Sequence, residues 1–191
     1  MTSILKADTI QDAAGNNIIN EAGDVITIGA SGDTINIAGT VGTGFSANTP
    51  YFEAYISANQ TLADATDTKL NFNTETFDSG GMYDTTNFRF LPTTAGKYLI
   101  YFQVTYNAGG VDKFHSCETQ VRKNGSIHKK YYFDDYDNYM SYAKCTTGST
   151  IIDFNGSSDY VEMYGNFNVT SSTGQVESGS YSTFGGYKLI T

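Results

Sequence analysis

The residues that could carry out chemistry are few and scattered. The chain has two histidines, His115 and His128, and two cysteines, Cys117 and Cys145. Nucleophilic catalysis by serine or cysteine needs a histidine base that a carboxylate orients, and neither histidine lies in such an arrangement. His115 and Cys117 are two residues apart, so a strand would place both on one face in ordinary structural positions. We therefore predict a protein that is not an enzyme and needs no cofactor.

Carboxylates and thiols add little to this list. Five of the twenty acids precede residue 51, and the remaining fifteen always offer pairs that could hydrolyse a glycosidic bond, so a capsule-degrading depolymerase remains an alternative. No Cys-x-x-Cys pair is present for zinc or redox work, and two cysteines are too few for a disulfide framework. Both are expected to be free, buried thiols.

One stretch concentrates groups that could bind a ligand, because residues 131–142 hold six aromatic side chains and three aspartates. Tyrosine offers a rigid amphipathic contact area and aspartate accepts hydrogen bonds from sugar hydroxyls, so this is a candidate recognition loop for a host glycan or protein. A hairpin with core aromatics and an aspartate turn explains the same composition, and calcium binding is less favoured because the twelve-residue calcium loop is missing. The candidate residues are Tyr131, Tyr132, Asp134, Asp135, Tyr136, Asp137, Tyr139 and Tyr142.

Charge and hydropathy exclude two classes of partner. The net charge is −9 and no basic stripe is present, so binding to nucleic acid is not expected. The longest apolar run, Tyr98 to Phe102, is too short to insert into a membrane, and the segment Met1 to Lys6 lacks the apolar core of a secretory signal. This favours a protein that stays in the cell that makes it, or leaves by lysis or as part of an assembly.

β-Strands must position these residues. The chain is rich in Tyr (15), Phe (12) and Gly (20), and no stretch has apolar residues at helical spacing. From residue 51, strand-like segments recur about every ten residues, each bounded by turn residues, which predicts an all-β sandwich or jelly roll. Lys123-Asn-Gly-Ser126 predicts a two-residue hairpin turn. The expected strands lie near 51–57, 68–73, 86–91, 97–107, 116–123, 127–133, 140–145, 149–154, 159–168 and 180–190.

The strand from Tyr98 to Tyr106 is the clearest of these. Every second residue from Tyr98 is apolar or aromatic, which predicts a core face. On its other face, Leu99 and Tyr101 also need a cover, which we interpret as a neighbouring subunit. Tyr160 and Tyr164 would point outward if Val161, Met163 and Phe167 face the core. The predicted trimer interface is therefore Leu99, Tyr101, Tyr160 and Tyr164, and an ordinary wet surface is the alternative.

Residues 1–45 have a different pattern. Isoleucines recur at a spacing of nine, and Gly23-Asp-Val-Ile-Thr-Ile28 and Gly32-Asp-Thr-Ile-Asn-Ile37 repeat one unit. Such a unit is a turn followed by a short strand, which must stack on itself or wind with identical chains; a flexible arm is the alternative. The linker Gly39 to Pro50 then separates a segment 1–45 from a domain 46–191.

The domain resembles the complement C1q-like globular heads. The motifs that carry the resemblance are Tyr51-Phe-Glu-Ala54, Thr68-Lys-Leu-Asn-Phe72, Phe88-Arg-Phe-Leu-Pro92, Ala95-Gly-Lys-Tyr98, Val121-Arg-Lys-Asn-Gly125, Ser158-Asp-Tyr-Val161 and Ser182-Thr-Phe-Gly-Gly-Tyr-Lys-Leu189. Ser158-Asp159 stands where a Gly-Asp turn is usual, and no collagen repeat is present. The resemblance implies a ten-stranded jelly roll of the C1q and tumour-necrosis-factor type that assembles as a homotrimer.

The N-terminal segment resembles the start of virion proteins of marine tailed bacteriophages, cyanophages among them. The matching runs are Ser3-Ile-Leu-Lys-Ala-Asp-Thr-Ile-Gln-Asp12, Gly15-Asn-Asn-Ile-Ile-Asn20 and Ile26-Thr-Ile-Gly-Ala-Ser-Gly-Asp-Thr-Ile35. This implies a tail fibre, appendage or decoration protein of the virion, assembled in the bacterial cytoplasm, whose segment 1–45 binds other tail, neck or capsid proteins. A secreted C1q-like lectin or ligand is the alternative. The expected anchoring residues are Ile4, Leu5, Ile10, Ile19, Ile28 and Ile37.

Overall fold

The structure is a computed structural model, and it divides the chain into two units, Met1–Phe45 and Ser46–Thr191. We describe each unit by itself. No helix in the described part of the chain is long and apolar enough to cross a membrane. The described residues are 9–11, 13, 17–22, 25–28, 32, 34, 48–110, 113–134, 142–170 and 174–189.

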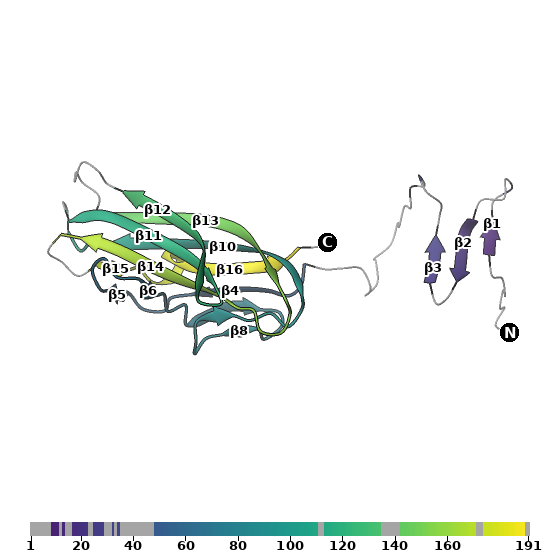
Figure 1. Ribbon diagram of the computed structural model, residues 1–191, viewed down its shortest axis with the longest axis horizontal. Coiled ribbons are helices and arrows are strands. Elements are labelled where there is room, and N and C mark those ends of the chain that lie inside the picture. The colour runs from purple at the N-terminus through teal and green to yellow at the C-terminus, as the bar shows by residue number, and fades with distance from the viewer. Residues whose placement is uncertain are drawn as a thin grey trace. The chain divides into compact units, whose positions relative to one another are not determined.

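The described part of the first unit is an antiparallel sheet of β1 (Thr9–Gln11), β2 (Asn17–Ala22) and β3 (Val25–Ile28), seen in Figure 1. Ile10 pairs with Ile19 across the first two strands, and Ile19 pairs with Ile28 across the next two. The nine-residue spacing therefore equals one strand plus its turn. Ile4, Leu5 and Ile37 lie outside the described residues.

The second unit, which we call the head, is a sandwich of two antiparallel sheets, as Figure 1 shows. The seven-stranded sheet contains β4 (Tyr51–Tyr55), β5 (Gln60–Leu62), β7 (Thr74–Asp78), β10 (Gly96–Asn107), β13 (Ala143–Phe154), β15 (Gly174–Val176) and β16 (Thr183–Lys188). The six-stranded sheet contains β6 (Thr68–Lys69), β8 (Tyr83–Asp84), β9 (Arg89–Phe90), β11 (Phe114–Lys123), β12 (Ser126–Asp134) and β14 (Val161–Val169). A short 3-10 turn, η1 (Gly179–Tyr181), precedes β16.

The alternation predicted for β10 is confirmed. Its inward residues Tyr98, Ile100, Phe102, Val104 and Tyr106 are all buried, and those predicted for β14, Val161, Met163 and Phe167, are buried too. Between the two sheets, Phe52 of β4 stacks on Phe90 of β9 with ring centroids 4.1 Å apart. Such aromatic contacts across the sandwich bury large apolar areas, which is the main stabilising term of the fold.

A chain of buried hydroxyl groups also joins the two sheets. The Tyr106 hydroxyl lies 2.7 Å from Thr119 Oγ1, which lies 2.6 Å from Thr146 Oγ1. Tyr106 and Thr146 belong to the seven-stranded sheet and Thr119 to the six-stranded one. Buried polar groups are tolerated when they bond each other, so this chain fixes the register of one sheet against the other.

One turn and one strand test the predictions of local structure made from the sequence. The hairpin at Asn124 and Gly125 is confirmed, because both residues have the positive φ of a type I′ turn, 51° and 79°. The strands expected at 140–145 and 149–154 are instead one strand, β13. Gly148 does not break it, because a Cβ there would lie 2.3 Å from the ring of Tyr131, so glycine serves packing rather than a turn.

Candidate interaction face

The outer face of the seven-stranded sheet carries an apolar row that crosses four strands. In register, Tyr51 of β4 lies beside Tyr187 of β16, which lies beside Leu99 of β10, which lies beside Ile151 of β13. Tyr51 is 42% exposed and Ile151 53%, while Leu99 and Tyr187 are half-buried. We call these four residues the apolar row. Large apolar side chains gathered in this way on an open sheet face are typical of an interaction site.

Tyr101 lies next to this row, in contact with the neighbouring strand. Its cross-strand partner on β16 is Gly185, and a Cβ on Gly185 would lie 2.4 Å from the Tyr101 ring. The ring therefore lies flat across the strand where no side chain intervenes. Its hydroxyl donates a 3.0 Å hydrogen bond to the Glu53 carboxylate. Burial of the ring, followed by the charge of Glu53, raises the pKa of Tyr101.

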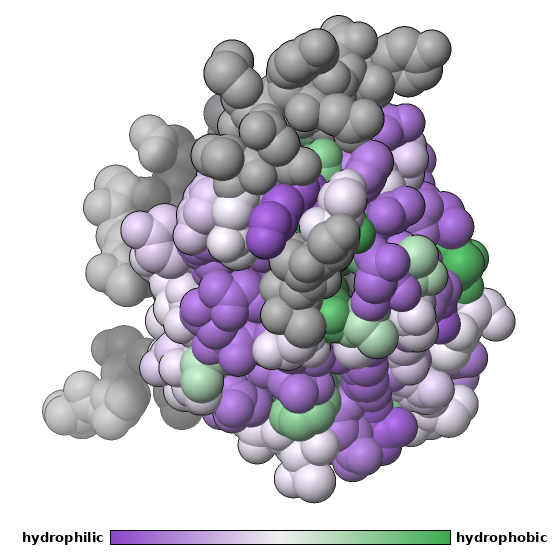
Figure 2. Space-filling model, turned by 90° about the vertical axis from the view of Figure 1, so that its left-hand side faces the viewer, coloured by the Kyte–Doolittle hydropathy of each residue, from purple (hydrophilic) through white to green (hydrophobic). Residues whose placement is uncertain are grey.

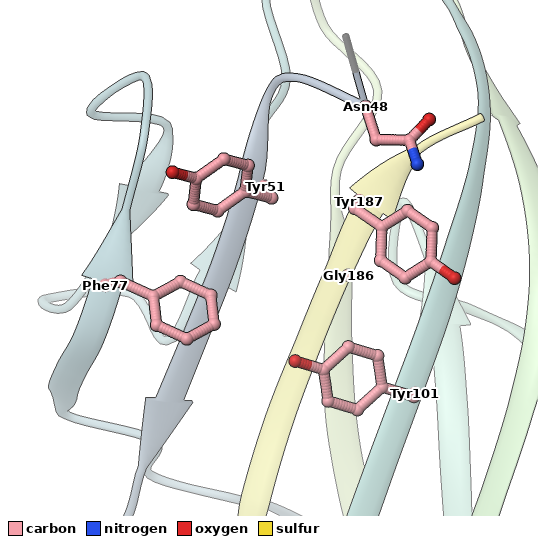
Figure 3. A pocket seen from close by; sticks show the side chains of 6 residues that line it. All are labelled: Asn48, Tyr51, Phe77, Tyr101, Gly186 and Tyr187. Atoms are coloured by element: carbon pink, nitrogen blue, oxygen red, sulfur yellow. The ribbon is translucent and has the colours of Figure 1, made fainter. Parts of the chain in front are cut away.

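Tyr51, Tyr187 and Tyr101 also line a shallow hollow of about 250 Å³, shown in Figure 3. In that view Tyr51 and Phe77 project from the neighbouring strands β4 and β7, and the Tyr101 ring reaches across β16. Tyr51 and Phe77 meet edge to face with centroids 5.6 Å apart. The walls are mainly aromatic, so the hollow, which we call the aromatic hollow, suits an apolar side chain. Its lining is Asn48, Tyr51, Phe77, Tyr101, Gly186 and Tyr187.

Polar residues lie on both sides of the apolar row along the strands. On one side Lys97 of β10 lies opposite Asp153 of β13, so opposite charges face each other. On the other side, beyond Tyr101, the outward residues Gln103, Thr147 and Thr183 follow in register, and Gln103 Nε2 donates to the Ser180 carbonyl at 3.1 Å. An apolar centre with a polar rim is the anatomy of a protein–protein interface.

The outer face of the six-stranded sheet is different, because its charged groups bind one another. Arg122 lies 3.9 Å above the Tyr164 ring and forms an ion pair with Asp67, while Lys130 pairs with Glu118 at 2.9 Å. Asn166 and Gln120 donate hydrogen bonds to Asp67, and these, Asn166 first, lower the pKa of that carboxyl.

The four predicted interface residues are therefore not brought together. Leu99 and Tyr101 lie on the outer face of the seven-stranded sheet. Tyr164 lies on the outer face of the six-stranded sheet, and Tyr160 directly precedes β14 in that sheet. Tyr160 lies beneath Arg89, whose guanidinium is 4.9 Å from its ring. The sequence did not predict a role for Tyr51, Phe77, Tyr187 and Ile151. Alternation about the buried Phe52 and Phe184 could have placed Tyr51 and Tyr187 outward.

The predicted recognition loop is only partly described. Tyr131 is half-buried: its hydroxyl donates a 2.6 Å hydrogen bond to the Ser149 carbonyl and its ring centroid lies 4.8 Å from that of Phe102. It thus joins β12 to β13, as the hairpin alternative proposed for such aromatics. Tyr132, Asp134 and Tyr142 are exposed. The other candidates, Asp135, Tyr136, Asp137 and Tyr139, lie outside the described residues.

The thiols and acids give no sign of chemistry in the described part of the chain. Both cysteines are free, and burial raises the pKa of Cys117 to about 12. Cys145, however, is exposed, which corrects the expectation that both are buried, because its side chain is on the outer side of β13, opposite Thr105. No group of three or more His, Cys, Asp or Glu residues that could hold a metal occurs among the described residues.

Figure 2 looks onto the end of the head that is remote from the C-terminus. Where atoms are coloured, hydrophobic residues are isolated spots between hydrophilic ones. The coloured part of this end is mainly hydrophilic.

Comparisons with known proteins identify the fold. No protein-family model matches the chain, and no curated protein sequence does either. Among solved structures, the globular domain of zebrafish complement 1qA matches with a TM-score of 0.52 and 10% identity over 74% of this chain and 98% of that one. Murine APRIL, crystallised at pH 8.0, matches with a TM-score of 0.51 and 12% identity over 73% of this chain and 98% of that one. The head therefore has the C1q and tumour-necrosis-factor type of jelly roll, as predicted.

Proposed function

We propose that the chain is a non-enzymatic recognition or bracing protein whose head assembles as a homotrimer through the outer face of its seven-stranded sheet. The observation that carries this proposal is the apolar row with Tyr101 beside it, an uncovered apolar surface with a polar rim. The resemblance of the sequence to C1q-like heads implies trimers, and it therefore supports an assembly of three copies. Three linked heads would bind a repetitive surface by avidity rather than by one tight site.

The geometry also suggests how the copies meet. A closed threefold ring needs two different complementary patches on each copy. The aromatic hollow lies at the β4 and β7 side of the sheet, and Ile151 protrudes from β13 on the other side of β10. We infer that Ile151 of each copy inserts into the aromatic hollow of the next. Such a contact would bury apolar area at both edges and leave no hollow unfilled.

The first unit supports a place for the protein in a virion. Its sequence resembles phage appendage proteins, and its isoleucine ladder gives a short sheet that other virion proteins could extend. On this proposal the protein is a tail fibre, appendage or decoration protein of a tailed phage, with the head in contact with a host surface or bracing the particle. The fold fits a secreted C1q-like ligand equally well.

Crosslinking of the full chain tests the ring. Phe77→Cys and Ile151→Cys are made separately in a Cys145→Ser background and then co-expressed. We expect light scattering to give trimers, and mild oxidation to join the two variants to each other but neither to itself. Ile127→Cys, a second exposed isoleucine, replaces Ile151→Cys as the matched control. A monomer at micromolar concentration contradicts the trimer, and a bond between two Phe77→Cys copies contradicts the ring.

Electron microscopy tests the virion proposal. Antibody to the head should label fixed sites on intact phage particles. Labelling of free protein in the medium, with none on particles, would favour the secreted ligand instead.

A further inference from the structure

The outer face of the six-stranded sheet carries one row of polar side chains that differs from the paired groups around Arg122. Asp134 of β12 lies opposite Ser116 of β11, which lies opposite Asn168 of β14. Asp134 and Asn168 are exposed and Ser116 is half-buried. None of the three side chains has a hydrogen bond or ion pair to another described residue. We call these three residues the polar row.

An exposed aromatic ring lies beside the polar row. Tyr132 precedes Asp134 by two residues, so both are on the same face of β12. Tyr132 is 61% exposed, more than any other large apolar side chain among the described residues. Its partner on β11 is Glu118, which accepts hydrogen bonds from Lys130 and Gln120. Tyr132 and the polar row together are called the shelf, and the groups on its inner side are already paired.

The backbone beneath the shelf is irregular at one point. The register between β11 and β14 shifts between Phe114 and Ser116, so His115 is an extra residue of β11. The His115 imidazole shares a hydrogen bond with the hydroxyl of Thr170, the residue that follows β14. Bulges re-aim side chains and are frequent next to binding sites. This bulge adjoins the polar row, and its hydrogen bond joins the two strands there.

The shelf combines an aromatic ring with free hydrogen-bonding groups. The Asn168 amide and the Ser116 hydroxyl both donate and accept, and the Asp134 carboxylate accepts. Neighbouring strands lie about 4.8 Å apart, so the polar row spans about 10 Å across its three strands. A sugar presents C–H groups to the negative face of a ring and hydroxyl groups to polar side chains. The shelf therefore matches a short row of sugar residues.

Charge and apolar area narrow the class of ligand further. Lys130, the cation nearest along β12, is paired with Glu118, so an anionic sugar would meet the Asp134 carboxylate and the net charge of −9. A protein partner favours an apolar centre, whereas Tyr132 is the only large apolar side chain of the shelf. A neutral glycan fits both observations.

We propose that the shelf binds a short segment of a neutral host-surface glycan. This inference rests on the proposed function, in which the outer face of the seven-stranded sheet forms the trimer. The shelf is on the other sheet, where β12, β11 and β14 lie side by side in Figure 1, so it is outside that contact. Three copies then present three shelves, and a weak single contact gains strength from avidity.

Saturation-transfer NMR on the full-length protein tests the shelf. Lactose, maltose and cellobiose are each added to about 10 mM, ten times the dissociation constant of about 1 mM that a single shallow contact gives. We expect at least one of them to give a saturable signal on its ring protons. Tyr132→Ala should weaken binding about tenfold or more, whereas Tyr132→Phe keeps the ring and should retain it. Asn168→Ala should weaken binding about fivefold, because one hydrogen bond is lost.

A matched control and two further measurements decide the outcome. Tyr181 of η1 is 58% exposed, so Tyr181→Ala removes a similar ring and should leave sugar binding unchanged. Loss of the signal in Tyr181→Ala but not in Tyr132→Ala would overturn the inference, as would no saturable signal from any of the three sugars. A signal from glucuronic acid alone would overturn the neutral class.

Light scattering on the same samples separates the two proposals. Trimers that bind none of the sugars would overturn the shelf and leave the proposed assembly intact. Monomers that bind a sugar through Tyr132 would overturn the assembly and leave the shelf. Loss of the trimer in Tyr132→Ala would mean that this ring is a subunit contact, and it would overturn the inference.

Discussion

The two outer faces of the head have similar backbones and opposite chemistry. On the six-stranded sheet, charged groups such as Arg122 and Asp67 satisfy one another, and the exposed apolar residues Ile127 and Tyr132 lie on its edge strand β12. On the seven-stranded sheet, Ile151 and Tyr51 remain open beside Leu99, and Tyr101 lies over glycine. Paired surface charges are stable in contact with water, whereas a row of uncovered apolar groups across four strands favours the binding of a partner.

The largest expected effect comes from a charge placed on the open face. Tyr101→Asp should convert the trimer into monomers, because closure would bury a carboxylate next to Glu53 without a cation, at a cost of about 3–5 kcal/mol. Light scattering measures the assembly and circular dichroism confirms that the sheet persists. Tyr164→Asp is the matched change on the self-paired face, where Arg122 can pair with the new carboxylate, so its trimer should remain. Loss of the trimer in Tyr164→Asp but not in Tyr101→Asp would mean that the six-stranded sheet forms the interface.

A smaller effect is expected from two exposed isoleucines. Ile151→Ser should raise the dissociation constant of the trimer about tenfold or more, because each insertion loses about 1–2 kcal/mol of apolar burial. Ile127 is nearly as exposed, at 48% against 53%, but lies at the start of β12 in the other sheet. Ile127→Ser should leave the dissociation constant unchanged, and analytical sedimentation of both variants measures it. Equal effects of the two changes would remove the distinction between the faces.

The chain of buried hydroxyl groups lies between the two sheets. Its loss should therefore lower the stability of the head without changing its assembly. Thr119→Val keeps the shape but removes the group that binds Tyr106 and Thr146. Tyr106 retains the Glu118 carbonyl at 3.0 Å, and Thr146 retains the Val104 carbonyl at 3.4 Å, so we expect a loss of only about 1 kcal/mol in the free energy of unfolding. Urea unfolding measures it. A change in assembly without a change in stability would contradict this account.

The smallest expected effect is a pH dependence of stability. It comes from Asp159, in the turn before β14 of the six-stranded sheet. Lys123, whose Nζ lies 2.8 Å from the Asp159 carboxylate, and Asn124 lower the pKa of Asp159 to about 2. A folded pKa below the unfolded value gives stability that is present above about pH 4 and lost as the pH falls toward 2. Thermal unfolding should therefore show a shallower fall over this range for Asp159→Asn than for the wild type. The exposed Asp134→Asn is the control, and an identical slope in all three proteins would contradict the prediction.

Short-range patterns in the sequence were enough to predict the type of fold. The alternation at Tyr98 to Tyr106 identified the core strand, and Asn124-Gly125 identified a hairpin, because both depend only on neighbours along the chain. The candidate interface was predicted less well. Leu99 and Tyr101 were found on β10, but Tyr187 and Ile151 join them only through cross-strand register, and register between distant strands cannot be read from local composition.

Two glycines show a further feature that the sequence pattern could not predict. Gly148 was expected to separate two strands, yet it lies within β13 and makes room for Tyr131 of the other sheet. Gly185, inside the strand expected at 180–190, makes room for Tyr101 of the neighbouring strand β10. The sequence pattern cannot separate a glycine that turns the chain from one that receives a ring, because the ring comes from a residue far away in the sequence.

The isoleucine register of the first unit has a consequence for how the chain can change in length. Because Ile10, Ile19 and Ile28 are partners in adjacent strands, a duplication of nine residues would add one strand and leave every existing pair in place. An insertion whose length is not a multiple of nine would change the nine-residue spacing that places the isoleucines opposite one another. Related sequences are thus expected to differ in this region by whole repeats, so that the sheet of the first unit grows by one strand at a time.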